Sequence, residues 1–383
     1  MQKIVRDSAL DILKPDALKV VGPIMMLSGG GLNQTFFSMG SIKCLNDNGM
    51  FYNKENDEFY FKVISAISGG TILLTFLDMA TNPQYAYHLR EGDWYTKYVR
   101  EPLYRLTEIN IMTQLLKSGF NVDKTTRQIF DTIPEYDEEI QQENTNIICE
   151  YNYIDAHRME LSCDHTDIID ISGSGVTKVK NWHLIRTSRC CLPFTNFSEV
   201  PTYDGGIIAN LPITGIMNTY NTNEYCIITA HGNKTYDKYK PLQTFDLVTS
   251  IISRITLAAN KGLTSVLNLT EEQIKNSIVC TASGEINPSE DSIHRGFMKD
   301  WCEIDVTTLY YNGILFCYED ALKVIENEGY IQMYSELKRL YPGKELEFKI
   351  PNPDVYRRDI VEQIVQKYKT MNPGHEFIKT FFE

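Results

Sequence analysis

The chain has 383 residues, of which 43% are hydrophobic and 23% are charged, and its formal net charge is −13. This balance is typical of a globular enzyme and excludes a disordered, collagen-like or repeat-array chain. The acidic charge argues against nucleic-acid binding and against broad adhesion to anionic membranes, since both need a clustered positive surface. No nucleic-acid partner is therefore expected.

No segment is typical of export or of membrane insertion. Residues 1–13 mix Lys3, Arg6 and Asp7 with apolar residues and lack the unbroken apolar stretch of a secretory signal. The longest charge-free apolar run, residues 63–77, is shorter than the ~20 residues that a membrane helix needs. Nine cysteines, an odd number, then indicate free thiols in a reducing compartment. We expect an intracellular protein without a transmembrane segment, whose contact with membranes is at most peripheral.

The N-terminal part alternates strand, glycine turn and helix. Residues 22–28 form an apolar run that stops at three consecutive glycines, which indicates a strand buried on both faces. A packed helix is predicted over 34–46, a second strand over 59–67, and a buried helix over 71–80. This rhythm predicts an α/β sheet with parallel strands.

The rest of the chain continues the mixture of strands and helices. Residues 85–130 have a helical and aromatic pattern, 131–144 are acidic and predict an exposed loop, and the tail from 319 is mostly amphipathic helix with a proline-marked break near 342–353. Further strands are predicted over 145–153, 168–172, 224–229 and 277–282, and helices over 181–191 and 245–261. We expect one α/β domain over 18–325 with a helical insertion at about 84–146, and a helical extension over 326–383 packed on the same domain.

The first motif with chemical meaning is Gly29-Gly30-Gly31. Consecutive glycines after a buried strand let the backbone turn tightly and point several N–H groups at one spot, with a helix N-terminus just behind. Such a turn suits a phosphate or a developing oxyanion, although alone it indicates only a turn. The spacing is not the G-x-G-x-x-G of a dinucleotide-binding loop, and no Gly-Lys-Ser/Thr of a Walker loop follows.

The second motif is Ala66-Ile67-Ser68-Gly69-Gly70. A nucleophile on a sharp strand-to-helix turn needs very small residues two positions before and two after it, because the neighbouring backbones nearly touch. Ala66 and Gly70 meet that demand, and a helix starting at Gly69 places its positive end beside Ser68. By itself the motif fits equally well a glycine-broken strand with an incidental serine.

The third motif is Asp204-Gly205-Gly206. Asp-Gly is among the commonest turn dipeptides, so alone this motif predicts only a turn. At the same sheet edge as Ser68, however, the Asp204 carboxylate can accept the serine proton directly, without an imidazole between them. The order of the three motifs along the chain favours this serine–aspartate dyad.

Taken together, these motifs resemble those of the patatin-like phospholipases and their relatives, the cytosolic phospholipases A2 and fungal lysophospholipases. Those enzymes carry a glycine-rich oxyanion loop, a G-x-S-x-G elbow and a D-G-G/A motif. Residues 188–193 and Asn210-Leu211-Pro212 also look like segments that flank the family's aspartate, so the resemblance covers about residues 20–215.

The resemblance implies a three-layer α/β/α sandwich with a mostly parallel central sheet. It also implies a lipid acyl hydrolase, a phospholipase, lysophospholipase or lipase, that acts on fatty-acyl esters at a membrane or micelle surface through an acyl-serine intermediate. Ser68 would be the nucleophile and Asp204 its base, with no cofactor and no metal. The amides of Gly29, Gly30 and Gly31 would hold the oxyanion.

Two departures from the family pattern stand out. The family loop commonly continues G-G-G-x-R-G, whereas this chain has Leu32-Asn33-Gln34, and the elbow begins with Ala66 in place of glycine. Both leave the dyad intact and bear on rate and head-group preference. A direct carboxylate base also predicts that activity persists at mildly acidic pH.

Other interpretations stay open. An α/β-hydrolase esterase would use His231 or His294 as its base, and a lipid-binding or scaffold protein would keep the fold without the activity. A zinc site around His157, Cys163 and His165 lacks paired ligand spacing, so we interpret that region as a surface loop.

Overall fold

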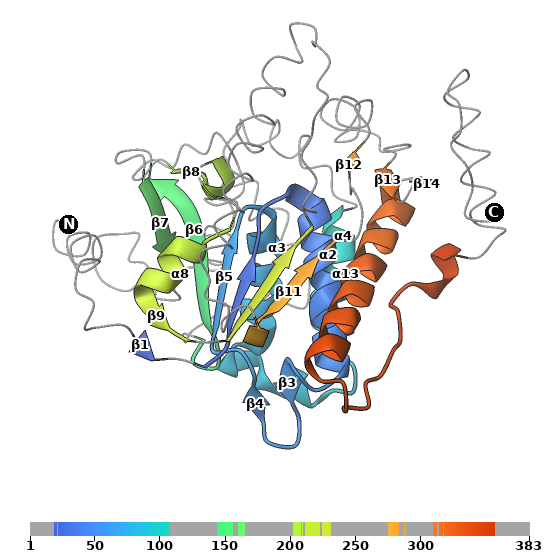
Figure 1. Cartoon of the computed structure of the whole chain (residues 1–383), viewed down its shortest axis with the longest axis horizontal. Helices are drawn as coiled ribbons and strands as arrows, with labels where there is room; N and C mark the ends of the chain where they lie inside the picture. The colour runs from blue at the N-terminus through green and yellow to red at the C-terminus, as the bar shows by residue number, and fades with distance from the viewer. Residues whose placement is uncertain are drawn as a thin grey trace, which may run out of the picture.

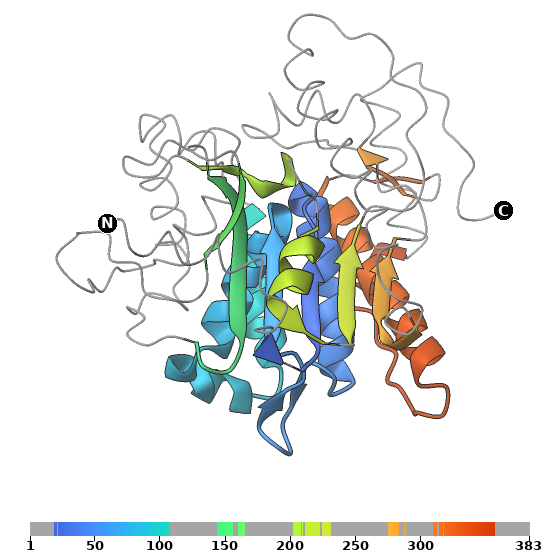
Figure 2. The same cartoon turned by 60° about the vertical axis from the view of Figure 1, so that its left-hand side comes forward.

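The structure is a computed structural model that describes residues 19–20, 22–107, 144–155, 160–164, 202–207, 209, 211–222, 224–230, 275–282, 287–288, 309–311, 314–316 and 318–356. Within these residues the chain forms a central sheet with helices on both faces (Figures 1 and 2). No described helix combines the length and the apolar composition that crossing a bilayer requires.

The described part of the central sheet has seven strands, with β11, β10, β2, β5, β6 and β7 side by side and β8 also paired to β6. The pairings from β11 to β6 are parallel, whereas β7 and β8 run antiparallel to β6. The strands are β2 (Ile24–Leu27), β5 (Val63–Ile67), β6 (Ile148–Asp155), β7 (Glu160–Asp164), β8 (Thr202–Asp204), β10 (Tyr225–Thr229) and β11 (Ile278–Thr281). The predicted α/β class with a mostly parallel sheet is confirmed.

Strand β6 is longer than β5 and has two partners on one of its edges. Its pairing with β5 ends at Ile67↔Asn152, and its pairing with β8 begins one residue later, at Asp204↔Tyr153. Residues 153–155 pair with both β7 and β8, so these two strands lie on opposite edges of β6. Strand β8 therefore shares an edge with β5, and the ends of the two strands meet.

Helices cover both faces of the sheet and create two apolar layers. Helices α2 (Gly31–Asp47), α3 (Gly69–Thr81) and α13 (Tyr318–Leu340) pack on one face, and α8 (Ile213–Thr219) lies on the other (Figure 2). Because successive side chains of a strand point to opposite faces, Met25 and Leu27 join the first layer while Ile24 and Met26 join the second. The described elements thus form three layers, α/β/α.

Two glycines bring the backbones of α2 and α13 into direct contact. A Cβ atom added at Gly40 would lie 1.8 Å from Glu326 O, and one added at Gly329 would lie 1.9 Å from Phe37 O. No larger residue fits at either position without moving a helix. Helix α13 therefore fixes the position of α2, whose first residue is the last glycine of the Gly29-Gly30-Gly31 turn.

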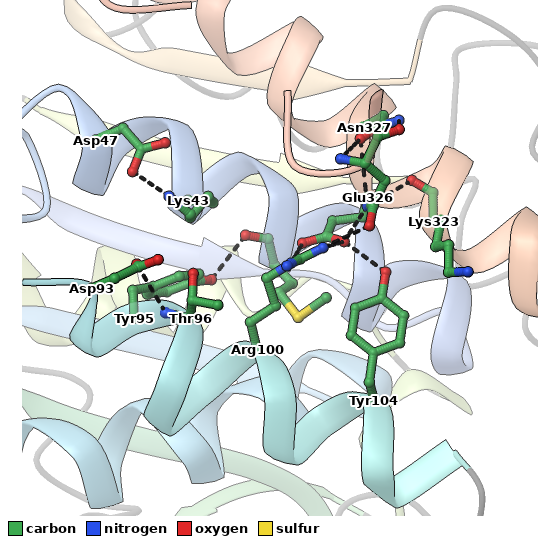
Figure 3. A network of polar contacts seen from close by, with 12 residues as sticks. Lys43, Asp47, Asp93, Tyr95, Thr96, Arg100, Tyr104, Lys323, Glu326 and Asn327 are labelled. Carbon is green, nitrogen blue, oxygen red and sulfur yellow. Dashed lines mark hydrogen bonds and ion pairs between the residues drawn. The ribbon is translucent and has the colours of Figure 1, made fainter. Parts of the chain in front are cut away.

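A buried polar network joins α13 to the helical segment that follows α3 (Figure 3). Arg100, at the end of the π-helical turn η4 (Thr96–Arg100), forms an ion pair with Glu326, whose side chain is fully buried. In α4 (Glu101–Thr107), the Tyr104 hydroxyl donates to Glu326 Oε2 at 2.6 Å. Asn352 Nδ2 donates to the same oxygen at 2.6 Å, and its Oδ1 accepts from Arg100 Nη2 at 2.6 Å. The network anchors the chain that follows α13.

The remaining described elements are small. They are β1 (Lys19–Val20), β3 (Tyr52–Asn53), β4 (Glu58–Phe59), η3 (Pro83–Arg90), η6 (Gly205–Ile207), β9 (Tyr220–Asn221), β12 (Asn287–Pro288), β13 (Leu309–Tyr311), β14 (Ile314–Phe316) and η9 (Pro353–Tyr356).

Most predicted elements that fall on described residues exist with shifted bounds. Strands β2, β5, β6, β10 and β11 and helices α2, α3 and α13 occupy the regions where these elements are predicted. Of the described residues of the expected insertion, 84–107 contain η3, η4 and α4, whereas 144–146 are not helical. Helix α13 is continuous through 325 and 326, where the C-terminal extension is expected to begin. The strand predicted over 168–172 and the helices predicted over 181–191 and 245–261 lie outside the described residues.

The interpretation of the region around Cys163 as a surface loop is wrong for residues 160–164. These residues form β7, in which Cys163 pairs with Asn152 of β6. The absence of metal-ligand spacing does not by itself indicate a loop, and the backbone of these residues pairs with the long strand β6 from Asp155↔Glu160 to Tyr151↔Asp164.

Candidate active site

Ser68 occupies a strained turn between β5 and α3. Its φ of 48° and ψ of −124° lie in a region that residues other than glycine rarely adopt. The Ser68 carbonyl oxygen accepts from Thr71 N at 2.9 Å and from Thr71 Oγ1 at 2.5 Å, which closes the first turn of the helix. This is the sharp strand-to-helix turn that lifts a nucleophile above the end of a sheet.

The glycines after Ser68 allow the turn to pack directly on neighbouring backbone. A Cβ atom at Gly70 would lie 2.7 Å from Ser28 O, and one at Gly69 would lie 2.2 Å from Gly31 O and 2.7 Å from Gly31 N. The elbow therefore sits against the Gly29-Gly30-Gly31 turn. Ala66, where the family pattern has glycine, is fully buried and keeps its methyl group in the core.

Asp204 faces Ser68 from the end of β8. Its Oδ2 accepts a hydrogen bond from Ser68 Oγ at 2.6 Å, and its Oδ1 accepts from Gly206 N at 2.8 Å. The second bond is an Asx turn, which Asp-Gly sequences favour. A Cβ atom at Gly205 would lie 2.9 Å from Asn152 O, so glycine is required there as well. Both carboxylate oxygens thus have a donor, and the carboxylate is held toward the serine.

Burial raises the pKa of Asp204 from 3.8 to about 6, while the hydrogen bonds from Ser68 and Gly206 act in the opposite direction. A carboxylate with a higher pKa is a stronger base, and a base works best when its pKa is near the operating pH. This value also changes the expected pH behaviour, because it moves the titration of the carboxylate close to that of an ordinary histidine.

The Gly29-Gly30-Gly31 turn uses conformations that favour glycine. Gly30 has φ 144° and Gly31 has φ 60°. Helix α2 begins at Gly31, which is exposed, so the positive end of that helix faces the surface beside the elbow. Thr35 Oγ1 lies 2.7 Å from Gly69 O and 3.1 Å from Gly31 O, and this hydroxyl bridges the glycine turn and the elbow.

Two buried amides support this arrangement, and sequence patterns did not single out either as a supporting group. Asn152 Nδ2, in β6, donates to Ala66 O and to Ser65 Oγ, both at 2.9 Å. Gln34, noticed in the sequence only as a departure from a family pattern, makes its contacts with β10 and Ser28. No local signal singles out Asn152, because β6 also contains the polar residues Glu150 and Asp155.

Several predicted site residues are not placed. His157, His165, His231, His294, residues 188–193 and Asn210 lie outside the described residues. Pro212 directly precedes α8. His88, the one histidine of the described part, is buried and stacks on Tyr98 with ring centroids 3.5 Å apart. No cluster of His, Cys, Asp and Glu suited to a metal ion occurs among the described residues.

Comparisons with known proteins identify no family for this chain. No protein-family model matches it, and no curated protein matches it. Among solved structures, the crystal structure of VipD from Legionella pneumophila is similar over 84% of this chain and 67% of that chain, with 13% sequence identity and a TM-score of 0.32. A similarity this weak carries no argument, so the site is interpreted from its own geometry.

Proposed function

We propose that this chain is a carboxylic ester hydrolase that cleaves fatty-acyl esters of lipids, with Ser68 as nucleophile and Asp204 as base. The observation that carries the proposal is the 2.6 Å hydrogen bond from Ser68 Oγ to Asp204 Oδ2, made by a serine with positive φ at the end of a parallel strand. A buried serine–carboxylate contact can be structural, but a structural contact does not require a strained turn at the end of a sheet.

The proposed reaction proceeds in two halves. Asp204 Oδ2 takes the proton from Ser68 Oγ, which attacks the ester carbonyl carbon and forms a tetrahedral oxyanion. The intermediate collapses with cleavage of the bond to the alcohol oxygen, and Asp204 returns the proton to the leaving alcohol. Water then attacks the acyl-serine carbonyl while Asp204 accepts a proton from it. The second tetrahedral intermediate collapses with cleavage of the bond between the acyl carbon and Ser68 Oγ, Asp204 returns the proton to Oγ, and the fatty acid is released.

The glycine turn is the proposed oxyanion site. Gly31 lies against Gly69, next to the proposed nucleophile, and α2 starts there, where the first amides of a helix have no partner within the helix. Donors fixed in this way stabilise charge that appears only in the transition state, and the loss of one such donor typically costs about 10²–10³ in kcat. The lipid preference is proposed from the resemblance of the motifs, with a membrane or micelle surface as the place of action.

A fluorophosphonate probe tests the active serine directly. We expect the wild-type chain to gain one phosphonyl group at Ser68, detected by intact mass and peptide mapping, and Ser68→Ala to gain none. Unlabelled wild-type protein would instead support an inert lipid-binding or scaffold protein on this fold.

A panel of esters tests the substrate class. The wild-type chain should release fatty acid from phosphatidylcholine vesicles, lysophosphatidylcholine micelles or a triacylglycerol emulsion, and Ser68→Ala should not. Hydrolysis of a short p-nitrophenyl ester without activity on any of the three lipids would contradict the lipid assignment while leaving the ester hydrolase intact.

A further inference from the structure

The side chain of Gln34 is fully buried just behind the Gly29-Gly30-Gly31 turn, and each of its four hydrogen-bonding positions has a partner within 3.0 Å. Its Nε2 donates to Ser38 Oγ at 2.6 Å and to Ile228 O at 3.0 Å. Its Oε1 accepts from Ala230 N at 2.6 Å and from Ser28 Oγ at 3.0 Å. The backbone partners fix the orientation of the amide, because Ala230 N can only donate and Ile228 O can only accept.

The side-chain amide of Gln34 replaces the next backbone hydrogen bond of the β2–β10 ladder. The parallel ladder between β2 and β10 ends with Ser28 N donating to Ile228 O at 3.2 Å. In a continued parallel ladder, the next bond would run from Ala230 N to Ser28 O. Here Ala230 N donates to Gln34 Oε1 instead, and Ser28 O lies beside Gly70 of the elbow. The chain can therefore leave the sheet at Ser28 without leaving a buried N–H unpaired.

Ser28 connects this amide to the glycine turn. Its hydroxyl lies 3.0 Å from Gln34 Oε1, 3.1 Å from Thr229 Oγ1 and 2.9 Å from Gly29 O. Ser28 is fully buried and immediately precedes Gly29. Hydrogen bonds to Gln34 of α2 and to Thr229 of β10 thus fix the point where the chain leaves β2.

We propose that Gln34 is a positioning residue for the glycine turn. It holds the turn where the backbone amides of Gly29, Gly30 and Gly31 can donate hydrogen bonds to an oxyanion formed on Ser68. The inference rests on the proposed function and adds a residue that touches neither substrate nor the dyad. It also gives one departure from the G-G-G-x-R-G pattern a physical meaning, since Gln34 stands at the position of the last glycine and braces the turn from β10.

The test compares two variants that disturb the same amide on opposite sides. Gln34→Met keeps the length of the side chain but leaves Ala230 N and Ile228 O without this partner and releases Ser28. Ser38→Ala removes the partner that lies one turn further along α2, away from the glycine turn. Each variant is measured for kcat and KM on a p-nitrophenyl ester, for the rate of fluorophosphonate labelling, and for its urea unfolding midpoint.

We expect Gln34→Met to lower kcat and the labelling rate by about 10²-fold, with KM changed by less than about threefold, because the loss resembles that of an oxyanion donor. Ser38→Ala should keep kcat within about twofold of wild type. The pH at which activity is half-maximal should stay the same in both variants, since neither residue contacts Asp204.

Each outcome supports or overturns the positioning role of Gln34. Gln34→Met with wild-type kcat, or an equal loss in Ser38→Ala, overturns the inference while leaving the proposed function standing. A wild-type chain that neither hydrolyses esters nor is labelled overturns the proposed function and this inference with it. Should Gln34→Met fail to fold, Ser28→Ala replaces it, with an expected loss of about tenfold in kcat, and a wild-type kcat in that variant overturns the inference.

Discussion

The side-chain amide of Asn152 donates a hydrogen bond to the carbonyl oxygen of Ala66, at 2.9 Å, two residues before Ser68. The next residue of the same strand, Tyr153, pairs with Asp204. Strand β6 therefore acts as a common template, because Asn152 fixes the strand that leads to Ser68, the proposed nucleophile, and Tyr153 fixes Asp204, the proposed base. The distance between Ser68 and Asp204 depends on the spacing of two adjacent residues in one rigid strand.

Replacing Asn152 tests this template. Asn152→Leu has a similar volume but no donor, so Ala66 O loses a buried partner at a cost of about 1–3 kcal/mol in the free energy of unfolding. We expect kcat to fall by about tenfold as the elbow relaxes. Asn144→Leu is the matched control, because Asn144 is equally buried but donates to Asp78 and Thr81. Equal kcat losses in the two variants would show that the effect follows stability alone.

The identity of the base is tested by substitution. Asp204→Asn keeps the shape and the bond from Gly206 but cannot accept the serine proton, and we expect kcat to fall by about 10²–10⁴-fold. His231→Ala and His294→Ala should each keep kcat within about twofold of wild type. A collapse of activity in either histidine variant, with Asp204→Asn still active, would favour an esterase with a histidine base.

The raised pKa of Asp204 predicts a specific pH profile. Only the ionised carboxylate accepts the serine proton, so kcat/KM should be half-maximal at about pH 6 and fall about tenfold per unit below it. The mild-acid activity expected of an ordinary carboxylate is thereby reduced. A histidine base gives a similar profile, so this measurement supports the substitution test and does not replace it. A plateau that continues to pH 4.5 would contradict the pKa of about 6 for Asp204.

The same pKa predicts a cost in stability. Because folding raises this pKa from 3.8, the group favours the folded state below about pH 4, and that contribution is lost as pH rises through about 6. The free energy of unfolding of Asp204→Asn, measured with urea, should therefore exceed that of the wild type at pH 8 by more than at pH 4. An opposite trend would mean that the carboxylate is stabilised by its surroundings when ionised.

Breaking the buried Arg100–Glu326 ion pair should lower the free energy of unfolding far more than breaking an exposed ion pair. Arg100→Met leaves the Glu326 carboxylate buried without its cation and should cost about 3–5 kcal/mol in urea unfolding. Lys97→Met breaks a pair whose side chains are 53% and 39% exposed and should cost less than about 1 kcal/mol. The double variant Arg100→Met, Glu326→Gln should recover part of the loss, and full additivity of the two single losses would contradict a direct interaction.

The parts of the fold that the sequence predicts are those with a local cause. Strands β2 and β5 are mainly apolar runs with glycines shortly after them, and the need for Gly70 follows from the backbone of Ser28 that passes it. Strand β8 has no such signal, because three residues form a strand there only through the free edge that β6 offers beyond Ile67. The supporting role of Gln34 depends on β10, 194 residues away in the chain, and no local pattern reports it.

Helices α2 and α13 cross closely at Gly40 and Gly329, so α2 can take its final position only after α13 has been synthesised. Residues 24–70 already contain the serine and the glycine turn, but the helix that clamps α2 is made only after the ribosome has passed residue 340. In a nascent chain, the Ser68 hydroxyl and the glycine turn therefore lie beside a helix that α13 does not yet hold in place. The position of α2 is therefore fixed only after both Ser68 and Asp204 have been synthesised.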